Sequence, residues 1–486
     1  MTRLVRGSLL AVAFVVAACG GSSSSPSPAE SPAGTGTPTG SPTSAPTASP
    51  AASRTVAPTR TPSPAPTQTG GAGAVDWPVY HGDNTHTGQA SSFPAFTGTI
   101  GKSWAVKLDG AVYAEPLVVH GQVIAVTERD SFYALNAQTG AIVWTRKVGN
   151  PVSLSTLPCG NINPLGITGT PAYDATTNTL FAVAEVTGPK HVLFALDADT
   201  GTVRWSRNVD LSGDQPATHQ QRTALVVANG YVYFGFGGLA GDCGQYRGEL
   251  IGVPVTGQGA TIAYKVPVKR EGAVWATAGP AVDSTGNLYV STGNGSSTSS
   301  FDGSDSVVEL SSSLQMISRF APKTWASDNA RDLDLGSLGP VLLPGGWVFI
   351  AGKSGTGYVL KQGSLGGIGG QVSQASVCSG GAFGGAATSG NTVFVPCRSL
   401  LREVTIGADG SIHPGWQSTA AGYSPVIGGG VLWSVNANGS LVAIDPATGH
   451  ARASIKIGSV PHFATPTLWN GMIFNGTLSG VFASHV

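Results

Sequence analysis

The sequence predicts an all-β fold, an eight-bladed β-propeller that is preceded by a disordered tether. Three observations support this prediction. A strand-turn-strand pattern recurs along the chain, partner hairpins recur at intervals of roughly 40 to 60 residues, and an unpaired strand at the start of the domain matches a strand missing at its end. One propeller therefore accounts for residues 75–486 as a single domain.

The recurring pattern is clearest in residues 193–205 (LFALDADTGTVRW). Val192, Phe194 and Leu196 alternate with other positions, which is typical of a half-buried strand. In the DADTG turn that follows, Asp and Thr side chains bond local amides and the glycine takes a positive φ. Related segments occupy residues 132–144, 307–320 and 441–453, the second with a divergent turn.

Upstream hairpins share a second pattern, in which a small residue and Pro or Ala lead into an apolar strand, a Gly turn and another apolar strand. Four strands per unit at this spacing predict propeller blades. The last unit ends at residue 486 without a fourth strand, so we expect residues 99–108 to close it and remove the open sheet edges. The hairpins begin at Glu115, Thr170, Thr223, Gly279, Gly339, Ala386, Ser424 and Thr465.

The composition suits a turn-rich fold and excludes one class of partner. The chain contains 69 glycines, and only 11% of its residues are charged, against roughly 25% in an average soluble protein. Lys and Arg together number 26, as do Asp and Glu, so the formal net charge is zero. Without a basic excess, the sequence predicts no nucleic-acid partner.

The first residues have the pattern of a targeting segment. Arg3 and Arg6 precede an apolar run at residues 9–18, which is too short to span a bilayer. The segment VAAC at residues 16–19 resembles a bacterial lipobox, which implies a signal peptide over residues 1–18 and a lipid on Cys19. The alternative is a plain secretory signal with an incidental cysteine.

Residues 19–74 consist almost entirely of Ser, Pro, Thr, Ala and Gly. Such a segment cannot bury a core, so we expect a solvated, disordered linker that spaces the propeller from the membrane. The expected location is the cell envelope, with the protein lipid-anchored on the outer side of the cytoplasmic membrane in a periplasmic or extracellular setting.

Four cysteines remain after Cys19, namely Cys159, Cys243, Cys378 and Cys397. An even number outside the cytoplasm predicts two disulfides, and four cysteines allow three pairings. Cys378 and Cys397 flank one hairpin, and their pairing would leave Cys159 for Cys243. No spacing resembles a zinc site or a covalent haem motif.

The repeats, together with the opening DWPVYHGDNTHTG at residues 76–88, resemble those of pyrroloquinoline quinone (PQQ) dehydrogenases. They also resemble the non-catalytic relatives of these enzymes, which include outer-membrane assembly lipoproteins. The resemblance covers about residues 76–486. It implies a propeller of the quinoprotein type, with a ligand site at the mouth of the central channel.

Two segments resemble the calcium and quinone sites of the enzymes. In residues 234–253 the resemblance implies Asp242 as a calcium ligand, where the family uses Glu, and Arg247 as a cofactor contact. In residues 274–297 it implies Trp275 as the floor under a planar quinone and Asn294 as a second metal ligand. The alternatives are a solvated loop, packing between blades and an ordinary turn.

Two further segments resemble the catalytic part of the site. The run DLDLG in residues 328–343 implies Asp334 as general base and metal ligand, with Asp332 in reserve. Lys353 matches the cation that contacts the quinone oxygens, and Phe383 occupies a position where the enzymes usually keep Trp. The alternatives are a backbone-capping Asp and a surface cation on a hairpin.

Two features of the enzymes are missing. Residues 158–169 contain one Cys where the family commonly has a vicinal pair, and the Arg that follows the pair has no counterpart. Two hypotheses therefore stay open. The first is a monomeric PQQ- and calcium-dependent dehydrogenase of alcohols or sugars; the second is a non-catalytic scaffold that binds a protein or an envelope polymer. If calcium binds, Asp242, Asn294 and Asp334 should converge at about 2.5 Å from one point.

Overall fold

The structure is a computed structural model that describes residues 75–486. The expected signal peptide (1–18), the lipidation site Cys19 and the linker (19–74) lie outside the described residues. Within the described part of the chain, no helix is both long enough and apolar enough to cross a membrane.

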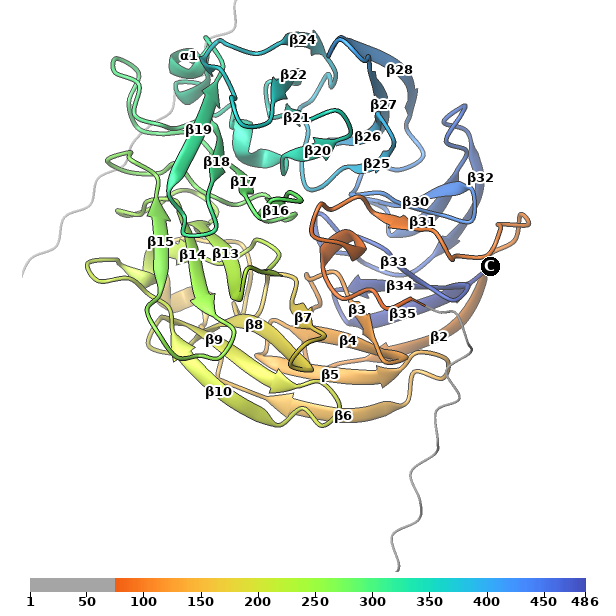
Figure 1. The fold of residues 1–486 in the computed structure, drawn as a ribbon. Coiled ribbons are helices and arrows are strands. Elements are labelled where there is room, and N and C mark those ends of the chain that lie inside the picture. Colours follow the sequence, from red (N-terminus) through yellow and green to blue (C-terminus); the bar gives the residue numbers. More distant parts are fainter. Residues whose placement is uncertain (1–74) are drawn as a thin grey trace, which may run out of the picture. The chain divides into compact units, whose positions relative to one another are not determined.

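The described residues form eight antiparallel blades around a central channel, as the sequence predicts (Figure 1). Each blade has four main strands, and the first strand of each lies nearest the channel. Blade 1 comprises β3 (Leu117–Val119), β4 (Gln122–Thr127), β5 (Ser131–Asn136) and β6 (Ile142–Lys147). Blade 2 comprises β7 (Ala172–Asp174), β8 (Thr179–Val186), β9 (Lys190–Asp197) and β10 (Val203–Asn208).

The next blades follow the same order. Blade 3 comprises β12 (Val226–Ala228), β13 (Tyr231–Gly238), β14 (Glu249–Pro254) and β15 (Ile262–Lys265). Blade 4 comprises β16 (Ala281–Val282), β17 (Leu288–Ser291), β18 (Val307–Leu310) and β19 (Met316–Ala321). Blade 5 comprises β20 (Val341–Leu343), β21 (Trp347–Ala351), β22 (Thr356–Lys361) and β24 (Ser373–Ser376). Blade 6 comprises β25 (Ala387–Ser389), β26 (Thr392–Cys397), β27 (Leu400–Ile406) and β28 (Ile412–Ser418).

Blade 7 comprises β29 (Val426–Gly428), β30 (Val431–Asn436), β31 (Ser440–Ile444) and β32 (Ala451–Lys456). Blade 8 combines β33 (Thr467–Trp469), β34 (Met472–Thr477) and β35 (Gly480–His485) with β2 (Gly101–Lys107). The sequence placed this closing strand at residues 99–108, and its antiparallel pairing with β35 confirms the prediction. Because the last blade takes strands from both ends of the domain, the ring closes without an incomplete blade.

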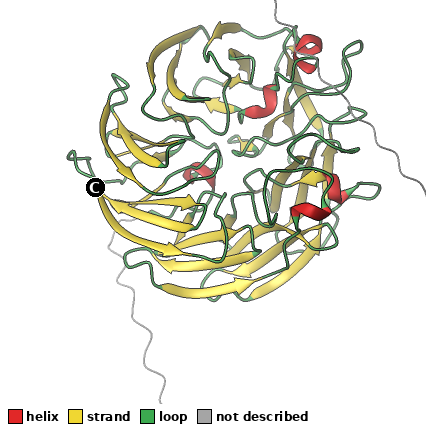
Figure 2. Ribbon diagram, turned by 180° about the vertical axis from the view of Figure 1, so that it is seen from behind, coloured by secondary structure: helices red, strands yellow, loops and turns green. Residues whose placement is uncertain are grey.

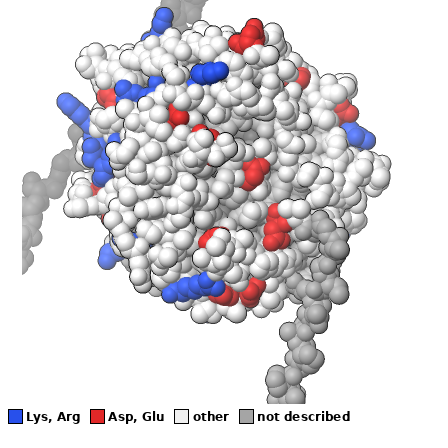
Figure 3. Space-filling model, in the orientation of Figure 1, with Lys and Arg blue, Asp and Glu red and all other residues white. Residues whose placement is uncertain are grey.

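Short elements complete the fold (Figure 2). The strands are β1 (Gln89–Ala90), β11 (His219–Gln220) and β23 (Gly367–Ile368). The helices are η1 (Tyr80–Gly82), η2 (Leu154–Thr156), η3 (Pro216–Thr218), η4 (Leu335–Ser337) and α1 (Trp325–Asn329). On the face drawn in Figure 3, charged side chains are sparse and scattered, and no continuous basic patch covers it.

The recurring Gly and Trp of the sequence pattern join neighbouring blades. Gly201 has φ +65° in the turn after β9, as the pattern predicts. A Cβ at this glycine would overlap the ring of Trp144 from the outer strand of blade 1. The indole Nε1 of Trp144 also donates a hydrogen bond to the carbonyl of Ala198, at 3.2 Å. The missing Cβ therefore lets each such Trp pack flat on the turn of the next blade.

The segment that opens the domain, residues 77–90, lies across the inner strands (Figure 1). The Pro78 carbonyl accepts a hydrogen bond from the Tyr173 amide of blade 2, at 2.8 Å. Farther along, the Gly88 carbonyl accepts one from the Ile427 amide of blade 7, at 2.7 Å. The segment thus bonds to inner strands of two blades and satisfies backbone groups that strand pairing leaves free.

Candidate functional site

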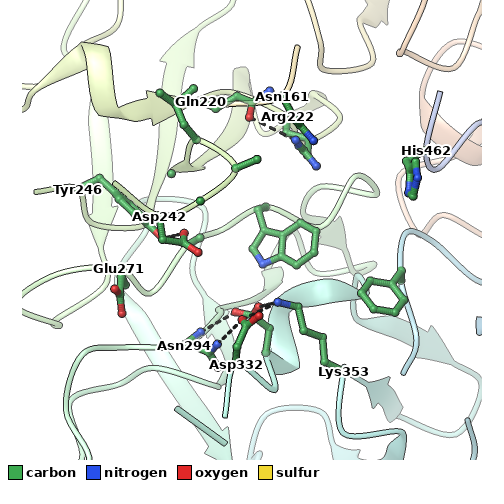
Figure 4. A pocket seen from close by; sticks show the side chains of 18 of the residues that line it. Asn161, Gln220, Arg222, Asp242, Tyr246, Glu271, Asn294, Asp332, Lys353 and His462 are labelled. Carbon is green, nitrogen blue, oxygen red and sulfur yellow. Dashed lines mark hydrogen bonds and ion pairs between the residues drawn. The ribbon is translucent and has the colours of Figure 1, made fainter. Parts of the chain in front are cut away.

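One cavity of about 560 Å³ lies where loops of several blades meet, and the predicted site residues converge on it (Figure 4). The loops that form it either join two blades or connect the second and third strands of a blade. The predicted residues that line it are Asp242, Trp275, Asn294, Asp332, Asp334, Lys353 and Phe383. These residues are spread along the chain from Asp242 to Phe383 and come from blades 3 to 6 and the loops between them, so the ring of blades brings them together.

An ion pair between Asp334 and Lys353 forms the centre of the cavity wall. Asp334 precedes η4 and is only 6% exposed, and the Lys353 ammonium, from the turn after β21, contacts its carboxylate. The same ammonium lies 2.7 Å from the carboxylate of Asp332, whose side chain is 73% exposed. The backbone amide of Asn294 donates to Asp334 Oδ1 at 2.7 Å, and its side-chain amide donates to Asp332 at 2.9 Å.

Burial and charge act in opposite directions on this pair. Burial raises the pKa of Asp334 above its ordinary value, while the Lys353 ammonium and the Asn294 amide oppose that rise. For Lys353, burial lowers the pKa, but the carboxylates of Asp334 and Asp332 outweigh it and leave the pKa raised. Asp334 is therefore a buried carboxyl group whose ionisation depends on one neighbouring cation.

Glycines in the predicted motifs allow this close packing. A Cβ at Gly293, in the TGNG segment, would overlap Asp334 Oδ1 and lie 3.3 Å from the indole nitrogen of Trp275. A Cβ at Gly352, next to Lys353, would overlap the Asp334 carbonyl oxygen. These glycines leave room for the carboxylate and its loop against the neighbouring backbone, which explains why they flank the site residues in sequence.

Aromatic side chains form another side of the cavity. The partly exposed indole of Trp275 lies with its ring centroid 5.7 Å from Lys353 Nζ. Phe463 meets Trp275 edge-on at 6.3 Å between centroids, and Phe383 stacks on Phe463 at 6.4 Å. A flat conjugated ligand could therefore lie on an indole face beside a fixed positive charge.

Carboxylates gather on the side of the cavity that blade 3 supplies. The Tyr246 hydroxyl donates to Asp242 at 2.5 Å, so this carboxylate is held although the residue is exposed. Glu271, which the sequence analysis missed, also lines the cavity. Burial raises the pKa of Glu271; Arg270 opposes the rise, and the nearby carboxylates of Asp242 and Asp334 add to it. Negative charge is thus concentrated at this end.

The arginine that reaches the cavity is Arg222 and not Arg247, which the sequence pattern had indicated as a cofactor contact. Arg247 is exposed and is not among the cavity-lining residues; its backbone carbonyl accepts a hydrogen bond from His219. Arg222, just before β12, lines the cavity instead, and its guanidinium donates to Gln220 at 3.3 Å. Sequence analysis passed over Arg222 because it precedes an inner strand without a recognisable motif.

Both predicted disulfides are present, Cys159–Cys243 and Cys378–Cys397. The first joins the loop between blades 1 and 2 to the loop that carries Asp242. Gly241 lines the cavity, and a Cβ there would lie 3.6 Å from Cys159 Sγ. A cross-loop disulfide therefore stiffens the rim of the cavity, where the sequence lacks a vicinal pair.

Oxygen donors for a cation are available, although they do not form a compact metal cluster. Across residues 75–486, no group of three or more His, Cys, Asp or Glu side chains is arranged to hold a metal ion. Asn294 Oδ1 is buried and has no hydrogen-bond partner within the described chain. It lines the same cavity as Asp242, Glu271 and Asp334, so the side chains present offer the hard oxygen ligands that suit Ca²⁺.

The fold and this cavity define an eight-bladed propeller of the PQQ-like class. The family model described as "Outer membrane protein assembly factor BamB" matches residues 63–159 and 88–361, more than half of the chain. The chain belongs to this family of PQQ-like propellers, as the resemblance predicted.

Individual relatives include enzymes and an assembly factor. Polyvinylalcohol dehydrogenase of Sphingopyxis sp. (strain 113P3) is 26% identical over 256 residues, a match that covers 47% of this chain and only 36% of that protein. Quinohemoprotein alcohol dehydrogenase from Comamonas testosteroni superposes with a TM-score of 0.64 at 18% identity, over 84% of this chain and 80% of that one. BamB from Moraxella catarrhalis gives 0.55 at 15% identity, over 79% and 99%. At these identities the structural likeness establishes the fold.

Proposed function

We propose that this chain is a PQQ-dependent dehydrogenase that oxidises a hydroxyl group of an alcohol or sugar, with Asp334 as the general base. The observation that carries the proposal is the buried Asp334 carboxylate, paired with Lys353 beside the Trp275 indole in one cavity. A buried, charge-coupled carboxyl group at a concave site is typical of acid-base catalysis.

The side chains present fit a planar, negatively charged quinone. Trp275 offers the ring face, and Lys353 and Arg222 offer positive charge around it. The cavity of about 560 Å³ is in the range of small-molecule sites. Asn294 and Asp334, with Asp242 or Glu271, would hold Ca²⁺, and the unpartnered Asn294 Oδ1 supports this assignment.

When bound, PQQ would supply the acceptor for a hydride from the carbon that bears the substrate hydroxyl. Asp334 would take the proton of that hydroxyl, so that the substrate leaves as a carbonyl compound. Lys353 would keep Asp334 ionised before the substrate binds, and Trp275 would exclude water from one side of the site.

A non-catalytic scaffold is the second candidate, and one observation favours it. Lys353 already neutralises Asp334 within the chain, so this carboxylate needs no metal to be stable. The family model described as an assembly factor and the fold shared with BamB support the same alternative. In this case the cavity face would bind an envelope protein or polymer.

The decisive experiment is a titration of the full chain with PQQ, with and without Ca²⁺, followed by absorbance and by melting temperature. A ligand at a hundredfold excess over its dissociation constant adds about 2.7 kcal/mol to stability. We expect binding that Asp334→Ala weakens, and that Asp409→Ala, at an exposed turn of blade 6, leaves unchanged. If PQQ does not bind with or without Ca²⁺, the dehydrogenase hypothesis is rejected and the non-catalytic scaffold is favoured.

The proposal places the protein in the cell envelope, anchored through lipid on Cys19 to the outer side of the cytoplasmic membrane. Stable anchoring needs more than one acyl chain, since each buried methylene contributes about 0.8 kcal/mol. Cells grown with labelled palmitate should incorporate label into the wild-type chain but not into Cys19→Ser. Equal labelling of both proteins would contradict the anchor.

A further inference from the structure

A second cavity of about 510 Å³ adjoins the proposed catalytic cavity. The two share five lining residues, Asp332, Lys353, Phe383, His462 and Phe463. From there the second cavity extends over blades 5 to 7, where it reaches Arg398 and Tyr423. The oxidation proposed above, acting on a small alcohol, leaves this space without a role.

A row of aromatic rings connects the two cavities. Phe463 meets Trp275 at 6.3 Å and the His462 ring at 5.8 Å between centroids. The His462 ring lies in turn 6.0 Å from the ring of Tyr423. None of these four side chains is fully buried, so the row presents ring faces and edges to the cavities.

The backbone of Phe463, where the two cavities meet, has an uncommon conformation. Phe463 has φ +66°, a region that bulky residues seldom adopt. Its carbonyl accepts a hydrogen bond from the Thr465 hydroxyl at 3.1 Å, which helps to fix the turn. Strained residues of this kind cluster at ligand sites, where the surrounding structure imposes them. The fold therefore fixes the position of Phe463, which lines both the cavity that Asp334 lines and the cavity that Tyr423 lines.

Resting on the dehydrogenase proposal, we infer that the second cavity holds the remainder of an extended polyhydroxylated chain whose reacting hydroxyl lies at Asp334. The lining combines ring surfaces with hydrogen-bonding groups, since it includes Phe383 and Tyr423 as well as Asp332, Lys353 and Arg398. A chain of CH and CHOH groups offers apolar edges to the rings and hydroxyls to the polar groups. A purely aliphatic alcohol would offer no hydrogen-bonding groups to Arg398 and His462, and a short alcohol at Asp334 would not reach Arg398.

Calorimetry of the full chain without cofactor tests this inference, because it requires no turnover. The probes are maltohexaose and a polyvinyl alcohol oligomer as chains, glycerol as a short polyol and 1-octanol as an aliphatic alcohol. We expect at least one chain to bind at least tenfold more tightly than glycerol and 1-octanol. The two chains distinguish a saccharide from a simple carbon backbone. Equal or tighter binding of glycerol or 1-octanol overturns the inference.

Variants assign the binding to the second cavity. Tyr423→Ala and the exposed Arg398→Gln should each weaken chain binding at least fivefold, while PQQ binding stays unchanged. Tyr231→Ala is the matched control, because Tyr231 stacks on Tyr233 at the start of β13, away from both cavities. Arg398→Gln decides the outcome if Tyr423→Ala fails to fold, and wild-type affinity in that variant overturns the assignment.

The two proposals fail separately. If the chain binds through Tyr423 and Arg398 but PQQ does not bind, the oxidation is rejected and the polyhydroxyl-binding cavity stands. If PQQ binds but neither chain does, the second cavity is not a substrate site and the dehydrogenase proposal is unaffected.

Discussion

Lys353 forms an ion pair with the buried carboxylate of Asp334, and Gly352, next to Lys353, packs against the Asp334 carbonyl. The Lys353 amide also donates to the Asp334 carbonyl at 2.8 Å, so backbone and side chain are linked together. The charge state of the proposed base is therefore coupled to one cation, and replacing that cation should change its pKa in a known direction.

Lys353→Met removes the only ammonium that contacts Asp334 within the described residues. Burial then raises the pKa of Asp334 without opposition from that charge, so the pKa lies higher than in the wild type. Because the base acts when ionised, the acid limb of the kcat/KM profile should move to higher pH by the same amount. Lys361→Met, which removes a cation above the Trp347 ring on another surface, is the control. An unshifted limb in Lys353→Met would show that Asp334 is not the titrating base.

Gly293→Ala inserts a methyl group where Asp334 Oδ1 now lies. The carboxylate must move, so we expect PQQ affinity to fall by on the order of tenfold or more and stability to fall by about 1–3 kcal/mol. Gly380→Ala is the matched control, since its Cβ would meet only the Arg398 side chain at 3.5 Å. PQQ titration and thermal unfolding of both variants measure these two effects. Wild-type affinity in Gly293→Ala would argue against the assigned position of the quinone.

Trp144→Ala removes the indole that covers Gly201 of the next blade. A partly buried Trp with a hydrogen bond to Ala198 should contribute about 2–4 kcal/mol to the free energy of unfolding. Denaturant unfolding should show this loss, whereas Val143→Ala, at a position 48% exposed on the same strand, should change stability by less than about 0.5 kcal/mol. Similar losses in the two variants would contradict the role of the indole in joining blades.

Two buried histidines in the channel segment make stability depend on pH. Burial lowers the pKa of His81 to about 3 and that of His86 to about 4. The unfolded chain, with His pKa near 6.5, binds more protons than the folded one below that pH. Each histidine therefore contributes a loss of stability on acidification between about pH 6.5 and pH 4, of up to about 1.4 kcal/mol per pH unit.

His86→Gln isolates this effect from other groups. Burial also raises the pKa of Glu115 in the same region to about 8, which makes the folded state bind a proton that the unfolded chain releases and contributes the opposite slope. The difference between wild type and His86→Gln cancels that contribution. Chemical unfolding at pH 7 and pH 5 should show that acidification changes the free energy of unfolding more favourably in the variant than in the wild type. An equal change in both proteins would show that His86 does not remain neutral in the folded protein.

Much of the fold could be predicted because it repeats. The turn at Asp197 to Gly201 is specified locally by side-chain and glycine chemistry, and the period of the hairpins then gives eight blades. Local motifs pointed to Trp275, Asn294 and Lys353, and the structure brings these three residues to one cavity; their role in binding or catalysis stays a prediction.

The remaining site residues depend on ring closure, which no local pattern encodes. Arg222, Glu271 and Phe463 lie in loops between blades, and these loops do not repeat in sequence. Glu271 and Phe463 also have positive φ values of 75° and 66°, which their residue types do not favour. Arg247 shows the converse, since a motif pointed to it while Arg222 reaches the cavity. The metal ligands stay a prediction until calcium binding is measured.

The pairing of Gly101 with His485 determines when this protein can finish folding. Synthesis from the N-terminus makes β2 before all eight inner strands and β35 after every other described strand, so the ring cannot close until all the other blades have been made. Contacts that distant in sequence form slowly and expose unpaired strand edges meanwhile. Deleting residues 480–485 would therefore remove a central strand of blade 8 and separate β2 from the sheet.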